Sequence, residues 1–96
     1  MGSLRRIVLD VLKPHEPPLV DFTDRIDAVE CIDGITSSLI ELDQEVQNIK
    51  LTIEGEDLDY TAIEEAVSEL GGTVHSVDQV AYGEYIVEER RTLQDG

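Results

Sequence analysis

The first part of the chain alternates apolar and polar positions in the way that is typical of a β-strand. Within Leu4–Lys13, the residues Ile7, Leu9 and Val11 share one side of an extended backbone, because successive side chains of a strand point to opposite faces. Apolar residues also occur on the other side, which is typical of a central strand covered on both faces. The strand is predicted to end at Pro14, since proline has no N–H to donate to a neighbouring strand.

The next apolar residues recur at helical spacing. Leu19, Phe22, Ile26 and Val29 follow one another at intervals of three or four residues, so they form one stripe on an α-helix. Acidic residues near the start favour the same interpretation, because anions are stabilised near a helix N-terminus. The pattern predicts a helix over Leu19–Glu30.

A β-hairpin is predicted in the middle of the chain. Its strands cover Ile35–Leu42 and Asn48–Glu54, and the polar segment Asp43–Gln47 joins them. The second strand has the cleaner pattern, because every other residue from Ile49 to Ile53 is apolar.

A second amphipathic helix and a last strand complete the pattern. The helix runs to Leu70, and its N-cap is either Asp59 or Thr61, both of which can accept a hydrogen bond from the first helical turn. The last strand is predicted over Thr73–Tyr82. The polar residues 84–96 follow as a C-terminal extension.

Two successive strand–helix–strand units predict a single α+β domain over residues 1–96. Right-handed crossovers arrange such units as a ferredoxin-like β-α-β-β-α-β sandwich, or α-β plait, whose antiparallel sheet has the order 4-1-3-2 and both helices on one face. The uncovered face would carry Val8 and Leu12 among polar residues. Because a half-apolar open face on a small domain usually docks onto another surface, we expect a homo-oligomer.

The charge of the chain narrows the choice of partners. It has 22 acidic and 7 basic residues among 96, which gives a net charge of −15. Such a surface repels phosphate groups, so neither nucleic acid nor an anionic membrane is expected as a partner. Acidic residues spread along the chain, with lysine scarce, indicate a cytoplasmic protein adapted to very high salt, where charge repulsion is screened. We therefore expect a halophilic archaeon as its source.

Several kinds of site are disfavoured by the residues themselves. Cys31 is the single cysteine, which excludes an internal disulfide and a CxxC metal or redox motif. Its acidic neighbours Glu30 and Asp33 disfavour a thiolate. The chain also has no apolar run of about 18 residues that could span a membrane, and no serine in a GxSxG turn.

Two histidines could support chemistry. The predicted topology brings His15, Asp43–Gln47 and His75 to one edge of the sheet. Two imidazoles and a carboxylate can hold Zn²⁺, and two imidazoles can act as a proton-transfer pair. No HxxH or HExxH spacing supports this site. The alternative is that His15 makes a loop hydrogen bond and His75 is a half-buried strand residue.

Two acidic loops offer oxygen ligands for a cation. Asp43, Glu45 and Asn48 belong to the hairpin, and Asp57 and Asp59 precede the second helix. Carboxylate and amide oxygens are the usual ligands of Ca²⁺ and Mg²⁺, and a subunit interface could complete either site. Neither loop matches the EF-hand pattern. The alternative is a solvated acidic surface in which Asp59 serves as a helix cap.

Four blocks along the chain carry a resemblance to a known family. They are Arg6–Pro17, Glu41–Lys50, Gly55–Asp59 and Gly71–Asp78. In this order they resemble the archaeal domain of unknown function 211 family, and the resemblance covers nearly the whole chain. It implies a ferredoxin-like fold, a ring-like or other homo-oligomer and an archaeal origin, and it supplies no catalytic residues.

The sequence therefore favours a non-enzymatic assembly or regulatory module that binds a small molecule or an ion at subunit interfaces. The alternative is a divalent-metal-binding protein that uses an acidic loop or the edge with His15 and His75. An enzyme with a site between subunits is a third hypothesis, for which the sequence identifies no nucleophile, cofactor motif or acid–base pair.

Overall fold

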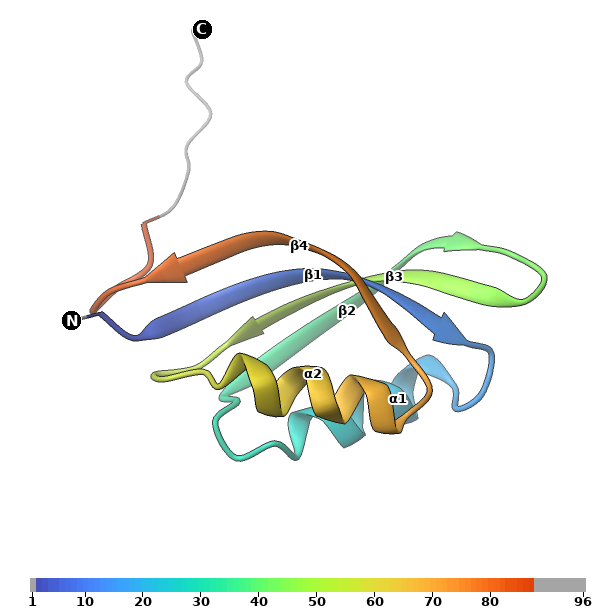
Figure 1. The fold of residues 1–96 in the computed structure, drawn as a ribbon, viewed down its shortest axis with the longest axis horizontal. Coiled ribbons are helices and arrows are strands. Elements are labelled where there is room, and N and C mark those ends of the chain that lie inside the picture. Colours follow the sequence, from blue (N-terminus) through green and yellow to red (C-terminus); the bar gives the residue numbers. More distant parts are fainter. Residues whose placement is uncertain (1, 88–96) are drawn as a thin grey trace, which may run out of the picture.

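The computed structural model describes residues 2–87 of the chain. Six elements follow one another in the order β-α-β-β-α-β (Figure 1). Their bounds are Leu4–Pro14 for β1, Leu19–Asp27 for α1, Gly34–Leu42 for β2, Val46–Glu54 for β3, Tyr60–Glu69 for α2 and Thr73–Tyr82 for β4. Within the described residues, neither helix is long and apolar enough to cross a membrane.

The four strands form one antiparallel sheet of order β2-β3-β1-β4, which is the predicted order read from the other edge. Both helices lie on the same face of this sheet (Figure 1). There α1 packs beside β2, and α2 packs beside β4. The predicted ferredoxin-like α+β fold is confirmed.

The core lies between the central strands and the helices. Ile7, Leu9 and Val11 of β1 are buried on the helix-facing side, as predicted, and each lies opposite a buried apolar residue of β3. Phe22 and Ile26 of α1 are fully buried against them. The predicted stripes thus meet in one largely aliphatic core, whose removal from water is the main stabilising contribution to a fold of this size.

Two element boundaries differ from the sequence prediction by two residues or more. Helix α1 ends at Asp27 rather than Glu30, because the chain then turns so that Ile32 can enter the core. Strand β3 begins at Val46 rather than Asn48, and the backbone N–H of Asp43 donates to the Val46 carbonyl at 3.0 Å. This hydrogen bond closes a hairpin loop that is shorter than the predicted loop Asp43–Gln47.

Helix α2 begins after one of the two predicted N-caps and ends at Glu69, one residue before the predicted Leu70. The Asp59 side chain accepts a hydrogen bond from the backbone N–H of Ala62 at 3.3 Å, so Asp59 rather than Thr61 is the N-cap. After the helix, Gly71 has a φ of +86°, a left-handed conformation that glycine adopts without steric cost. This turn directs the chain into β4.

Strand β4 ends at Tyr82, as predicted. Gly83 follows with a φ of +121°, and residues 84–87 belong to no helix or strand. The rest of the predicted C-terminal extension, residues 88–96, lies outside the described part of the chain.

Lys13 is the unexpected member of the core. It lies on the helix-facing side of β1 and is fully buried. Its Nζ donates to the carbonyl oxygen of Pro14 at 2.8 Å and to Gln47 Oε1 at 3.0 Å. It also lies 5.7 Å from the centre of the Phe22 ring, a cation–π distance. Lys13 thereby ties the end of β1 to β3 and α1.

Candidate functional site

The structure places His15 and His75 at the same end of the sheet, but they join no cluster of three metal-binding side chains among the described residues. His15 Nε2 lies 3.0 Å from the carbonyl oxygen of Asp43, so this ring nitrogen is the donor of a loop hydrogen bond. His75 lies on β4, at a bulge between the pairs that Val11 and Asp10 make with that strand. The predicted loop bond of His15 is confirmed, whereas His75 is exposed rather than half-buried, because β4 is an edge strand.

The hairpin residues do not converge either. The Asp43 carboxylate accepts a hydrogen bond from the backbone N–H of Gln44 at 2.6 Å, and Glu45 is exposed in the turn. Asn48 lies on β3 opposite Leu12, on the sheet face away from the helices. The three predicted ligands of the hairpin therefore belong to two different surfaces.

The second acidic loop has a structural role. Asp59 caps α2, and its backbone N–H donates to the Cys31 sulfur at 3.3 Å. Cys31 is half-buried and thus links the turn after α1 to the start of α2. Asp57 is exposed in the same loop.

No metal centre forms within the described residues. Across residues 2–87, no group of three or more histidine, cysteine, aspartate or glutamate side chains lies close enough to hold a metal ion. The predicted Zn²⁺, Ca²⁺ and Mg²⁺ sites gain no support from the geometry of one chain and stay predictions.

The edge strands of the sheet carry much of the exposed apolar surface. A strand at a sheet edge has one row of unpaired backbone groups, which can pair with another chain. β2 and β4 are the two edges here. Their exposed apolar side chains are Leu39, Ile40 and Leu42 on β2 and Val77, Val80 and Tyr82 on β4, each 46–62% exposed.

These edges also lack the charges that normally protect a strand from pairing. Glu41 is the one charged residue among the nine of β2, and Asp78 is the one acidic residue among the ten of β4, which has no lysine or arginine. In the whole chain 30% of residues are charged. Since natural proteins usually place charged side chains, especially lysine, on exposed edges, both edges are suited to a partner strand.

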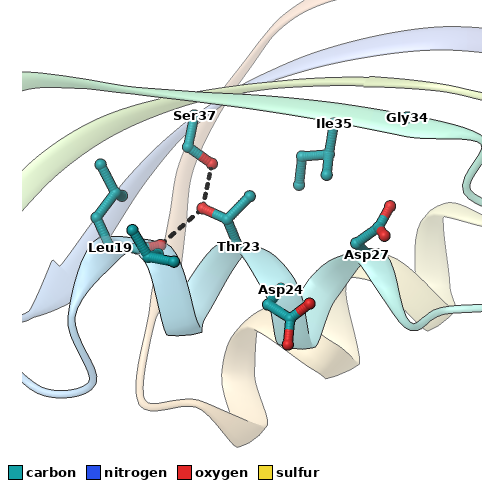
Figure 2. Close-up of a pocket in the computed structure, with 8 residues that line it drawn as sticks. Leu19, Thr23, Asp24, Asp27, Gly34, Ile35 and Ser37 are labelled. Atoms are coloured by element: carbon teal, nitrogen blue, oxygen red, sulfur yellow. Dashed lines mark hydrogen bonds between the residues drawn. The ribbon is translucent and has the colours of Figure 1, made fainter.

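A groove of about 570 Å³ lies between α1 and β2, next to one of these edges (Figure 2). Thr23 Oγ1 donates to the Leu19 carbonyl at 2.8 Å and lies 2.7 Å from Ser37 Oγ. The Ser37 hydroxyl must donate the second bond, because a hydroxyl has only one hydrogen. With these groups satisfied, the lining offers apolar surface and the carboxylates of Asp24 and Asp27.

The assembly expected from the sequence uses strand edges and the open sheet face, and the sequence of β2 already carries a signal for particular edge residues. Leu39, Ile40 and Leu42 are apolar on both faces of a strand that the predicted sheet order places at an edge. A half-covered edge strand needs apolar residues on one face only. The surplus leaves apolar side chains of β2 exposed in the described chain.

Comparison with known proteins identifies relatives over almost the full length. The family model DUF211, described as Uncharacterized ArCR, matches residues 5–96. An uncharacterized protein of the archaeon Methanocaldococcus jannaschii is 48% identical over 95 residues, which cover 99% of this chain and 98% of that protein. The chain therefore belongs to the DUF211 family.

Proposed function

We propose that this chain is a cytoplasmic, non-enzymatic assembly module in which β2 of one copy pairs with β4 of the next copy. The observation that carries the proposal is the pair of sheet edges described above, which are exposed, apolar and almost free of charge. Natural proteins usually protect an exposed edge with charged side chains or cover it, so uncharged apolar edges support pairing with another strand.

The two edges match each other. β2 has nine residues and β4 has ten, so the backbone groups of one strand can pair along most of the other. Side chains such as Leu39 and Val80 would leave water at the interface. Burial of apolar area contributes about 25 cal/mol per Å², and the groove beside β2 gives the neighbour's side chains a concave surface to enter.

Pairing of two different edges is head-to-tail. Each copy uses β2 for one neighbour and β4 for the other, so the assembly grows until its rotation closes a ring. A small ligand or ion bound at these interfaces would stabilise the assembled state, so the fraction of assembled chains would depend on the ligand concentration. This dependence is the regulatory part of the proposal. Each copy has a net charge of −15, so assembly requires the screening that a very salty cytosol provides.

The oligomeric mass tests the proposal. Size-exclusion chromatography with light scattering in molar KCl should give one discrete mass of several copies, and a clean monomer would refute the proposal. Val80→Lys should dissociate the assembly, because a charge on β4 opposes burial of that edge. Val87→Lys is the matched control, since this valine is exposed outside the strands, and it should leave the mass unchanged.

A mixing experiment tests which edges pair. Leu39→Lys damages β2 and leaves β4 intact, whereas Val80→Lys does the reverse. Each variant alone should be monomeric, and a mixture should form a heterodimer and nothing larger. If β2 instead paired with β2, Val80→Lys would keep the wild-type mass, and this result would overturn the head-to-tail arrangement. Native mass spectrometry of protein from its source reads stoichiometry and any bound molecule in one spectrum.

A further inference from the structure

A hollow of about 380 Å³ lies in the middle of the sheet face that the helices leave open. Its lining comes from all four strands. The residues that matter here are Val8 and Asp10 of β1, Ile40 of β2, Asn48 and Lys50 of β3, and Asp78 of β4. Its volume falls in the range of small-molecule sites.

Irregular pairing of the edge strands builds this hollow. The register of β2 against β3 shifts between Leu39 and Glu41, which leaves Ile40 unpaired. The register of β4 against β1 shifts between Val8 and Leu9, which leaves Asp78 unpaired. A bulge adds a residue to one strand and bends it. The extra residues, Ile40 and Asp78, line the hollow from opposite edges of the sheet.

One residue of the lining, Asn48, has a polar atom without a partner among the described residues. Asn48 Oδ1 is buried and accepts no hydrogen bond from any residue of the described chain. An unsatisfied buried acceptor costs about 1–3 kcal/mol, so such atoms call for a physical explanation. A ligand whose N–H group donates to Asn48 Oδ1 would explain this unsatisfied acceptor.

Charges of both signs surround this acceptor. Asp10 lies directly opposite Lys50 in the pairing of β1 with β3, yet their side chains do not form an ion pair within 4.0 Å among the described residues. Asp78, on the far side of β1, accepts a hydrogen bond from the Ser76 hydroxyl at 2.7 Å. The hollow therefore presents an ammonium group on β3 and carboxylates on β1 and β4.

This combination selects one class of ligand. A simple anion is repelled by two carboxylates and by a chain of net charge −15. A simple cation would pair with the carboxylates but would leave Lys50 without an anionic partner. A zwitterion satisfies both signs, because its ammonium can reach Asp10 and Asn48 Oδ1 while its carboxylate reaches Lys50. Val8 and Ile40 supply apolar flanks for an aliphatic side chain.

We propose that the open sheet face binds an aliphatic α-amino acid in the hollow between Ile40 and Asp78. The site is formed within one copy, so it goes beyond the assembly proposed above and does not depend on it. The carboxylate of the amino acid is held by Lys50, and its ammonium group is held by Asp10 and Asn48.

Isothermal titration calorimetry with L-leucine tests the site, using two analogues that each lack one charge. Isocaproate lacks the ammonium group, and isopentylamine lacks the carboxylate. L-Leucine should bind with saturation, and each analogue should bind more weakly by on the order of tenfold or more, since each loses a charge-assisted hydrogen bond. Equal affinity for L-leucine and either analogue would overturn the proposal.

Variants locate the binding. Lys50→Gln should weaken L-leucine by on the order of tenfold and should not weaken isopentylamine, which has no carboxylate for the lysine to hold. Arg25→Gln on α1 is the matched control, because it removes one positive charge from an exposed position on the opposite side of the sheet. Loss of leucine binding in both variants, or in neither, would refute the site.

The mass of the same samples separates this proposal from the assembly. A monomer that binds L-leucine would refute the assembly and support the site. A ring that gives no binding heat with L-leucine at about 20 mM, above the millimolar range of weak sites, would refute the site and support the assembly.

Discussion

Replacing Lys13 by methionine tests whether its buried hydrogen bonds stabilise the fold. Methionine keeps a similar length and the contact with Phe22, but it removes the donor to Pro14 O at 2.8 Å and Gln47 Oε1 at 3.0 Å. The third contact, to His15 O at 3.5 Å, is long and counts for little. The variant therefore loses two good bonds.

The magnitude follows from these two bonds and one opposing effect. A buried acceptor left without a donor costs about 1–3 kcal/mol, and both Pro14 and Gln47 are half-buried, so water can restore part of the loss. The variant also avoids the cost of burying the Lys13 ammonium. We expect a net loss of about 2 kcal/mol in the free energy of unfolding, measured by urea denaturation at neutral pH.

The pH dependence gives the same variant a second readout. Burial lowers the pKa of Lys13 below its ordinary value of 10.5, and the Glu16 carboxylate partly opposes this shift. Between the lowered pKa of the folded chain and the ordinary value of 10.5, the unfolded chain binds more protons than the folded chain, so the free energy of unfolding rises with pH. The stability difference between wild type and Lys13→Met should thus widen as the pH approaches 10.5.

Lys50→Met is the matched control for this prediction. Lys50 is exposed on the open sheet face, so its replacement should change stability by less than about 0.5 kcal/mol. If Lys13→Met were as stable as the wild type, the hydrogen bonds of Lys13 would only offset the cost of its burial, and Lys13 would not stabilise the fold.

Three further outcomes follow from the structure. Gly55→Ala should cost about 1–3 kcal/mol, because a Cβ there would overlap the Cys31 carbonyl oxygen, whereas Gly34→Ala, with nothing within 4 Å of the added Cβ, should be nearly neutral in the same urea titration. Burial, and then the charge and hydrogen bond of Glu64, raise the pKa of Tyr60 above 10.0. Between pH 10.0 and the raised pKa the folded chain binds more protons than the unfolded chain, so the free energy of unfolding falls as the pH rises. Tyr60→Phe removes this contribution and should make the fall in stability above pH 10.0 shallower. Circular dichroism over a KCl series should show folding only as salt screens the net charge of −15, and a full folded signal at low salt would contradict adaptation to high salt.

The order of the elements was predictable because each depends on local patterns. Alternation over β1 and β3 and the stripe from Leu19 to Ile26 fix which side of each element is apolar. Once two strand–helix–strand units are present, right-handed crossovers leave few topologies. The same reasoning placed His15 and the hairpin at one end of the sheet, and the bond of His15 to Asp43 agrees with it.

The sites were less predictable, since they depend on which side chains face one another. Charge density along the chain suggested metal sites at Asp43, Glu45 and Asn48, but the register of β3 sends Asn48 to the open face, away from the hairpin loop. The bulges that make the hollow leave no pattern in the sequence, because an extra residue in a strand has no composition of its own.

The sequence by itself determined the elements, the apolar side of each and the strongly negative charge, since these depend on residue type and spacing alone. Only the tertiary structure decided that Lys13 is buried, that Asn48 Oδ1 has no partner within residues 2–87, and that the apolar residues of β2 and β4 stay exposed. Burial and hydrogen bonding are properties of neighbours brought together from distant parts of the chain, and spacing along one strand does not specify them.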